Sequence, residues 1–253
     1  MDFSLIETMR WEPDNGFARL NLHLARLKAS AQALGFEGAD LAETALANYV
    51  KTELRSGLIS SLEGEMSRSD RGGCVVEASI HPPLSPLATS PPQGGRSPET
   101  QSAHRVRLEL FRDGKINITS APFQLQSGDT IWKVKFASTQ LSSSDTLLQH
   151  KTSKRAVYDQ ARAEFSKDDA DEVLLLNKKG ELCEGTITSV FVDDGSGILL
   201  TPPLSSGLLA GVLRTSLLCA KKARVQKLMP GDLDGKALFV GNSLRGLIRA
   251  KVN

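Results

Sequence analysis

The stretch that decides the fold is HKTSKRAVYDQARAEFSKDDADEVLLLNKKGELCEGTITSVF, residues 150–191. It opens with Lys151, ahead of an amphipathic segment that has helical spacing. The apolar run 172–177 then predicts a buried strand, and Lys-Lys-Gly at 178–180 predicts the turn by which the chain returns. Glu184 follows the returning strand. From composition and spacing alone, the stretch therefore contains a lysine before a helix and a glutamate after a hairpin.

Size and composition place the chain in a broad class. Its 253 residues can form one large domain or two small ones, and 40% hydrophobic residues suffice for a core. The net charge of +2 does not indicate a nucleic-acid surface, which would need clustered Lys and Arg. We find no signal-peptide core and no apolar run near the roughly 18–20 residues of a membrane helix. We therefore expect a soluble, cytoplasmic globular protein.

The cysteines support the same compartment. There are three, they are widely spaced, and they form no CxxC pair. An odd number without metal-ligand or redox spacing is most simply explained by reduced thiols in the core. The residues are Cys74, Cys183 and Cys219.

The first half of the chain predicts a small α/β unit. Its apolar patterns change from alternation to helical spacing and back again. The expected elements are a strand (2–11), an Asn-Gly turn (12–16), a helix from Asn21 to Leu34 stopped by Gly35, a second helix (39–56) and a hairpin (105–111 and 115–120). Residues 57–80 give no clear pattern. Residues 81–102 hold six of the eleven prolines, so we expect an exposed loop or a disordered insertion.

The second half predicts a strand-rich unit. A polar segment, 124–130, suits a linker, and the division expected is residues 1–123, linker 124–130 and residues 131–253. Beyond the deciding stretch itself, the pattern predicts strands over 131–137, 186–192, 198–201 and 237–240, and a helix over 208–223. The coarse fold class is therefore α+β.

Several catalytic motifs are absent from the sequence. It contains no GxxxxGK[ST], no GxGxxG after a strand, no HExxH and no GxSxG. The four histidines lack metal-ligand spacing, so we expect no metal site; they are His23, His81, His104 and His150.

A set of scattered segments points to one family. In chain order they read FSLIETMRW, GFARLNLHLARLKASAQALGF, RVRLELFRDGKI, HKTSKRAVYDQAR, DEVLLLNKKGELCEGTITSVFV, TPPLSSGLLAGVLR and GNSLRG. Together they resemble the class IV aminotransferases, the fold-type-IV pyridoxal 5'-phosphate (PLP) enzymes, and most of all the 4-amino-4-deoxychorismate lyases among them. The resemblance covers nearly the whole chain except residues 57–104. It implies a two-domain α+β fold with PLP in the cleft between the domains.

The resemblance implies roles for three charged residues. Lys151 matches the family lysine that forms an imine with PLP, passes the cofactor to the substrate amine and then moves protons. Glu184 matches the acid that keeps the pyridine nitrogen protonated. Arg26 matches the arginine that binds the phosphate, for which a guanidinium offers a planar fork of donors. Without the resemblance, each would be interpreted as a solvated side chain, and His23 as a structural histidine.

Two turns match the phosphate-binding turns of the family. In the first the backbone N–H groups at a helix start would hold the anion; its residues are Leu209, Gly211, Val212 and Leu213. Asn242 and Ser243 match the second turn, and Tyr158 and Thr152 are weaker candidates for contact with the cofactor. The family often has Pro at position 210 and Thr or Ser near 213, where this chain has Ala and Leu, and Asn at position 189, where it has Ser. One side-chain contact with the phosphate is therefore expected to be missing.

Three hairpin arginines are open to two interpretations. Arg105, Arg107 and Arg112 could meet substrate carboxylates, but a β-hairpin commonly exposes such side chains to solvent. We favour the solvent-exposed interpretation.

The resemblance implies an activity and two rivals. The expected reaction is PLP-dependent conversion of 4-amino-4-deoxychorismate to pyruvate and 4-aminobenzoate, a step of folate biosynthesis. A homodimer and an association with aminodeoxychorismate synthase are expected with it. The first rival is a class IV transaminase acting on branched-chain or D-amino acids. The second is a catalytically impaired homologue, suggested by the short N-terminus and by the 81–102 insertion.

Overall fold

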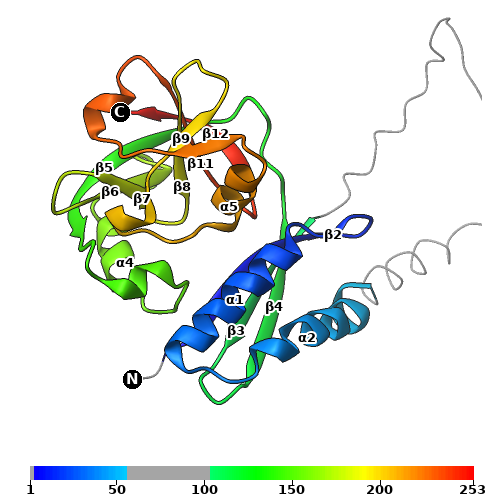
Figure 1. Ribbon diagram of the computed structural model, residues 1–253. Helices are drawn as coiled ribbons and strands as arrows, with labels where there is room; N and C mark the ends of the chain where they lie inside the picture. Colours follow the sequence, from blue (N-terminus) through cyan, green and yellow to red (C-terminus); the bar gives the residue numbers. More distant parts are fainter. Residues whose placement is uncertain (1–2, 56–102) are drawn as a thin grey trace, which may run out of the picture.

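A computed structural model describes residues 3–55 and 103–253. The expectations for residues 57–80, for 81–102 and for Cys74 lie outside the described residues. Two sheets organise the described part, one of four strands and one of eight. Figure 1 shows the small sheet with its two helices on one side of the molecule and the large sheet on the other.

The small sheet is antiparallel, with the order β2-β1-β3-β4. Its strands are β1 (Leu5–Glu12), β2 (Gly16–Phe17), β3 (Ala103–Leu110) and β4 (Ile116–Phe123). The alternating sequence explains the two faces of this sheet. Leu5, Met9 and Trp11 on β1 pack into the core, as do Val106 and Leu108 on β3. The predicted strand 2–11 and the predicted hairpin are confirmed.

Helices cover the apolar face of the small sheet (Figure 1). Helix α1 (Leu20–Leu34) ends at Gly35, which adopts the left-handed conformation that favours glycine. The predicted second helix is divided into a 3₁₀ turn η1 (Ala39–Leu41), α2 (Ala42–Tyr49) and a π-helical turn η2 (Val50–Leu54). Residues 124–130 join β4 to the next strand without regular secondary structure.

The large sheet is mixed, with the order β10-β9-β8-β11-β12-β5-β6-β7. Its strands are β5 (Ile131–Leu141), β6 (Glu172–Asn177), β7 (Leu182–Gly185), β8 (Ser189–Asp193), β9 (Leu199–Thr201), β10 (Ala223–Val225), β11 (Ala237–Asn242) and β12 (Gly246–Val252). Strands β12, β5 and β6 run parallel to one another, as do β9 and β10, and the other neighbouring pairs are antiparallel. The deciding stretch supplies β6, β7 and β8, as predicted.

Both faces of β6 are buried, which explains its uninterrupted apolar run. Leu174 packs into the cluster around β8 and β11, whereas Val173 and Leu175 pack beneath helix α4 (Ala156–Ala163). Short 3₁₀ turns connect these elements: η3 (Thr146–Gln149), η4 (Leu204–Ser206) and η5 (Pro230–Leu233).

The predicted helix 208–223 is shorter in the structure. Helix α5 spans Val212–Cys219, because the residues before it are extended and residues after it form β10. The backbone N–H of Leu209 bonds to a side chain instead of a helical carbonyl, and Lys221 adopts a left-handed conformation that ends the helix. Cys183 is buried as expected, but Cys219 at the end of α5 is exposed, so the expectation of a core thiol is wrong there. Within the described ranges, no helix is both long and apolar enough for a membrane span.

Candidate active site

A cavity of about 310 Å³ lies between the two sheets and is lined by elements of both. On the side of the small sheet the lining comes from β1, β3 and α1. On the side of the large sheet it comes from β7, the start of α5 and the turn between β11 and β12. The structure brings ten of the eleven predicted site residues to this cavity: Arg26, Lys151, Thr152, Tyr158, Glu184, Leu209, Gly211, Val212, Asn242 and Ser243. Leu213 is the exception, because its buried side chain faces Gly241.

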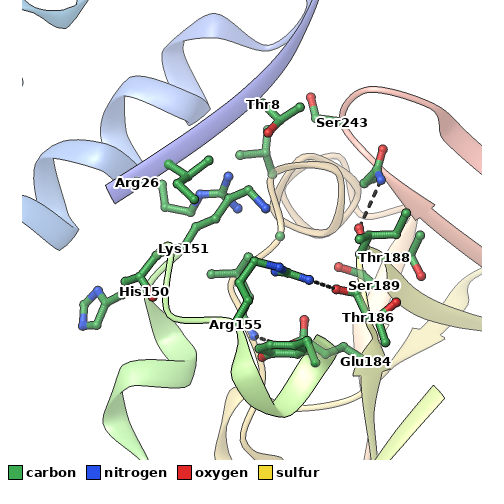
Figure 2. A pocket seen from close by; sticks show the side chains of 18 of the residues that line it. Thr8, Arg26, His150, Lys151, Arg155, Glu184, Thr186, Thr188, Ser189 and Ser243 are labelled. Atoms are coloured by element: carbon green, nitrogen blue, oxygen red, sulfur yellow. Dashed lines mark hydrogen bonds between the residues drawn. The ribbon is translucent and has the colours of Figure 1, made fainter. Parts of the chain in front are cut away.

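Lys151 lies in the connection between η3 and α4 of the large-sheet half, at the point where this connection contacts β1 of the small sheet. The N–H of Ile6 donates to the Lys151 carbonyl at 2.8 Å, and the N–H of Ser153 donates to the Ser4 carbonyl at 2.9 Å. The segment around Thr152 therefore pairs with the free edge of β1, and α4 starts soon afterwards. Backbone pairing thus fixes the position of the lysine. In Figure 2 its side chain lies between Arg26 and Glu184.

The surroundings of Lys151 favour a neutral amine. Burial and the nearby Arg26 guanidinium lower the pKa of Lys151 to about 8. Glu7 and Glu184 act in the opposite direction and are weaker. A buried lysine with this pKa is partly deprotonated near neutral pH, which is the form that attacks a carbonyl group.

Arg26 is held by a buried carboxylate. Its Nε and Nη2 donate to Glu7 Oε1 and Oε2 at 2.9 and 2.6 Å, and its Nη1 donates to the Ala210 carbonyl at 3.2 Å. His23 lies one turn earlier on α1 and contacts Glu7 through Nδ1 at 2.6 Å. Its Nε2 lies 2.9 Å from Ser243 Oγ, so both ring nitrogens of His23 are hydrogen-bonded as expected, and the residue also lines the cavity.

Glu184 forms the other end of the cavity and has neutral partners. Its Oε1 accepts from the Tyr158 hydroxyl at 2.7 Å and from the Leu209 N–H at 3.1 Å. Burial raises the pKa of Glu184 to about 7. Both hydrogen bonds end on Oε1, and none of the described residues donates to Oε2. The Oε2 atom can therefore accept a hydrogen bond from a donor in the cavity.

The two predicted turns meet near Arg26. Gly211 precedes α5, and a Cβ atom at this position would collide with Ser189 Oγ, so a larger residue would require Ser189 to move. The first N–H groups of a helix lack acceptors within the helix, and here they begin at Val212. In the second turn the Asn242 side chain accepts from the N–H groups of Leu244 and Arg245 at 3.1 and 3.0 Å. Asn242 therefore shapes the turn.

A third buried carboxylate, Glu172 on β6, organises one wall of the cavity. It accepts from the N–H and hydroxyl of Thr186, the N–H of Ile187 at 3.1 Å and the hydroxyl of Thr188 at 2.8 Å. These residues follow β7 as a loop, which explains why the strand predicted over 186–192 begins only at Ser189. Arg155 donates to the Thr186 carbonyl from the opposite wall (Figure 2).

Two of the three hairpin arginines line the cavity. Arg105 and Arg107 share the face of β3 that points away from α1, opposite Thr8 of β1, and both contribute to the lining. Arg112 instead donates to the Leu34 carbonyl at 3.0 Å and stacks on Phe36 outside the cavity. Arg105 is exposed and the Arg107 side chain is 40% exposed, so the prediction of solvent exposure is confirmed, and both arginines are also accessible from the cavity.

The sequence reasoning missed Glu7, Glu172 and Arg155. One signal was present for Glu7: it shares a strand face with Leu5, Met9 and Trp11, and a carboxylate on an apolar face needs a buried partner. Glu172 gave no comparable signal, because it stands at the edge of an apolar run, where solvated glutamates are common. The described residues contain no group of His, Cys, Asp or Glu side chains that could hold a metal ion.

Comparison with known proteins gives consistent relatives. A "Putative aminodeoxychorismate lyase" of Schizosaccharomyces pombe is 31% identical over 121 residues, 46% of this chain and 51% of that protein. "Aminodeoxychorismate lyase" of Saccharomyces cerevisiae is 40% identical over 77 residues, 29% of this chain and 19% of that protein. The matched regions thus span about half or less of these curated relatives.

A solved structure matches over the full length. The "Putative amino-acid aminotransferase" of Mesorhizobium loti is 40% identical, with a TM-score of 0.76, over 100% of both chains. This match confirms the predicted α+β, fold-type-IV architecture. The profile of the family described as "Amino-transferase class IV" matches residues 95–252. Because that region is more than half of the chain, the protein belongs to the amino-transferase class IV family.

Proposed function

We propose that the protein is a PLP-dependent enzyme and that the cavity holds the cofactor. The single observation that carries this proposal is the order of three groups that line the cavity: a cation at Arg26, an amine at Lys151 and a carboxyl at Glu184. PLP presents a phosphate, an aldehyde and a pyridine nitrogen, and these three groups match them in charge and in hydrogen bonding.

The residues present fit PLP in their detailed chemistry. Arg26 has N–H groups beyond those it donates to Glu7 and Ala210, and the start of α5 adds backbone N–H groups. Gly211 leaves that helix start open to the cavity. The unshared Oε2 of Glu184 suits a protonated ring nitrogen, whose positive charge would lower the raised pKa of this carboxyl.

The residues would divide the chemistry as follows. When bound, PLP supplies an electron-accepting ring that stabilises negative charge developing on the substrate. Arg26 and the start of α5 would hold the phosphate, and Glu184 would keep the ring nitrogen protonated. Lys151 would remove the proton from the substrate carbon that bears the nitrogen, and would then donate a proton to the departing enolpyruvyl group. Tyr158 would hold the Glu184 carboxylate in place.

For the substrate we propose 4-amino-4-deoxychorismate, with release of pyruvate and 4-aminobenzoate. The cavity lining contains seven Lys or Arg residues and two Asp or Glu residues. A phosphate at Arg26 would use only part of this positive charge, so the remainder favours a substrate with more than one carboxylate. The curated lyases reported above support the same activity by similarity.

A class IV transaminase is the second candidate. The observation in its favour is the full-length relative from Mesorhizobium loti, whose name is that of an amino-acid aminotransferase. A transaminase would use the same Lys151, Glu184 and Arg26, so the cofactor end of the cavity does not separate the two activities. Branched-chain substrates have one carboxylate, and Arg105 and Arg107 would then lack a second partner.

Two measurements test these proposals in order. The first is a titration of the purified protein with PLP, followed by visible absorbance and by thermal stability. If PLP produces neither visible absorbance of the protein nor a gain in its thermal stability, the protein is an impaired homologue. The second is incubation of the loaded protein with 4-amino-4-deoxychorismate in the absence of a keto acid. Pyruvate release supports the lyase, whereas turnover that requires an added keto acid supports the transaminase.

We also propose a homodimer associated in function with aminodeoxychorismate synthase. The motivation is the family resemblance in the sequence. Light scattering of the purified protein measures its oligomeric state, and a monomer at micromolar concentration would contradict the proposed homodimer.

A further inference from the structure

Glu7 connects two elements of the cavity wall that belong to different sheets. Its side chain is almost fully buried, with 3% exposed. One partner is Arg26, a short distance from the start of α5; the other is His23, whose far nitrogen reaches Ser243 in the turn after β11. The chain Glu7–His23–Ser243 therefore extends from the small sheet to the large one.

The hydrogen bonds of Arg26 show what Glu7 does for it. A guanidinium has five N–H groups. Two of them donate to Glu7 and one to the Ala210 carbonyl, which leaves one on Nη1 and one on Nη2. The Glu7 carboxylate thus fixes the plane of the guanidinium and aims the remaining pair of donors. A glutamine at this position would place its own N–H₂ group against a donor of Arg26 or His23.

The hydrogen bonds of His23 fix a direction as well. An ionised Glu7 only accepts, so the 2.6 Å contact requires the proton to be on Nδ1. In a neutral ring Nε2 is then an acceptor, and the Ser243 hydroxyl must donate to it. If His23 is protonated, Nε2 donates to Ser243 Oγ instead, and the Ser243 hydroxyl can donate into the cavity.

We propose that Glu7 is a positioning residue for the anion end of the cavity, holding the Arg26 fork directly and turning the Ser243 hydroxyl toward a bound phosphate through protonation of His23. This inference rests on the proposed function, because PLP supplies the phosphate. It names no new ligand. It assigns to Glu7 the orientation of two donor groups, on Arg26 and Ser243, that line the same cavity.

The charges around His23 are consistent with a proton that moves on binding. Burial lowers the pKa of His23, so the ring is neutral near pH 7 before an anion binds. Glu7 of β1 raises that pKa, while Arg26 of α1 and Lys151 in the connection before α4 lower it. A dianion bound at Ser243 would offset the effect of these two cations and would raise the pKa of His23, which favours the protonated ring.

The first test compares two ligands that differ only in the phosphate. The dissociation constants of PLP and of pyridoxal are measured for the wild-type protein, Glu7→Gln and Glu12→Gln. Glu12 lies on the same strand and forms an ion pair with Arg10 at 3.0 Å, but it does not line the cavity, so it is the matched control. The ratio of the two constants isolates the phosphate, because both ligands react with Lys151.

We expect Glu7→Gln to reduce the preference for PLP over pyridoxal by about tenfold or more, and Glu12→Gln to leave it unchanged. An unchanged preference in Glu7→Gln overturns the inference. A wild-type protein that binds PLP no better than pyridoxal overturns the proposed phosphate site itself, so the two failures are distinguishable.

The second test needs no variant and remains decisive if Glu7→Gln fails to fold. Nitrogen-15 NMR of the four histidines reports which ring nitrogens carry protons. At pH 7.5 we expect His23 to be neutral with the proton on Nδ1, and doubly protonated after addition of 4-deoxypyridoxine 5'-phosphate, which lacks the aldehyde. A ring that stays neutral with this ligand bound overturns the link from His23 to Ser243.

Discussion

The two ends of the cavity are each built around a buried carboxylate, and the two carboxylates differ in charge. Glu7 is 2% exposed and Glu184 is 6% exposed. Burial raises the pKa of both carboxyl groups. At Glu7, however, Arg26 and His23 lower the pKa by more than burial raises it, to about 2. At Glu184 burial prevails and raises the pKa to about 7.

The partners explain this difference. Glu7 contacts a guanidinium and an imidazole, so its charge is balanced within the protein. Glu184 has neutral hydrogen-bond partners, a phenol and a backbone N–H, and burial raises its pKa by more than the charges of Lys151 and Arg155 lower it. At the Arg26 end the charge of the carboxylate is therefore balanced by an ion pair within the protein. At the Glu184 end the carboxyl group is available to a positively charged group of a ligand.

Lys151 lies between the two ends, and its removal should have the largest effect. Lys151→Ala should abolish the visible absorbance that PLP gains on attachment to the protein. It should also lower lyase activity by roughly 10⁴-fold, because the general base is lost. Absorbance spectra and pyruvate release measure the two effects. Lys167→Ala is the control, an exposed lysine outside the cavity; full activity in Lys151→Ala would refute the catalytic role.

Glu184→Gln tests the end of the cavity at which the carboxyl group has neutral hydrogen-bond partners. The amide oxygen can still accept from Tyr158 and Leu209, so the fold and PLP binding should persist. Activity should fall by roughly a hundredfold, because a neutral amide does not keep the ring nitrogen protonated. Turnover of the loaded variant measures this loss. Activity equal to that of the wild-type protein would remove Glu184 from the proposed mechanism.

The sequence predicted the fold well where one face of an element is apolar and its ends are marked. Helix α1 has helical spacing and a glycine stop, and β6 is a short apolar run before a Lys-Lys-Gly turn. The prediction missed β10 and β12 for a shared reason. Exposed charged residues interrupt both strands, and their pairing depends on neighbours that are distant in sequence.

The site was less predictable than the fold. The family resemblance selected Lys151, Arg26 and Glu184 because each matches a family residue that is proposed to contact the cofactor directly. The residues that hold them, Glu7 and Glu172, act through other side chains. Their partners are 16 and 19 residues away for Glu7, and only the packing of α1 on β1 brings them together.

The comparison of the two ends also predicts opposite dependences of stability on pH. The folded pKa of Glu184 is raised, so its contribution to the free energy of unfolding is full below about pH 4.5 and is lost as the pH rises through about 7. The folded pKa of Glu7 is lowered, so its contribution is present above about pH 4.5 and is lost as the pH falls toward 2. Each change should amount to about 3 kcal/mol.

Urea unfolding of the PLP-free protein between pH 3 and 7.5 checks these signs. The stability of the wild-type protein relative to Glu184→Gln should decrease from pH 4.5 to 7, and relative to Glu7→Gln it should increase from pH 3 upward. The same sign for both variants would contradict the comparison. Glu12→Gln again serves as the control, because its partly exposed ion pair with Arg10 is expected to contribute little.

Arg107→Ala should have the smallest effect, and it tests the substrate side of the cavity. Arg107 lies on β3 within the lining and forms a partly exposed ion pair with Glu109 at 2.9 Å. Its removal should raise the KM for 4-amino-4-deoxychorismate by about tenfold, because one carboxylate loses a charged partner, and should leave PLP affinity unchanged. Arg112→Ala removes the same charge from the same hairpin outside the cavity, so its KM should equal that of the wild-type protein. An unchanged KM in Arg107→Ala would mean that the cationic lining does not select a dicarboxylate, and the transaminase would then become the better candidate.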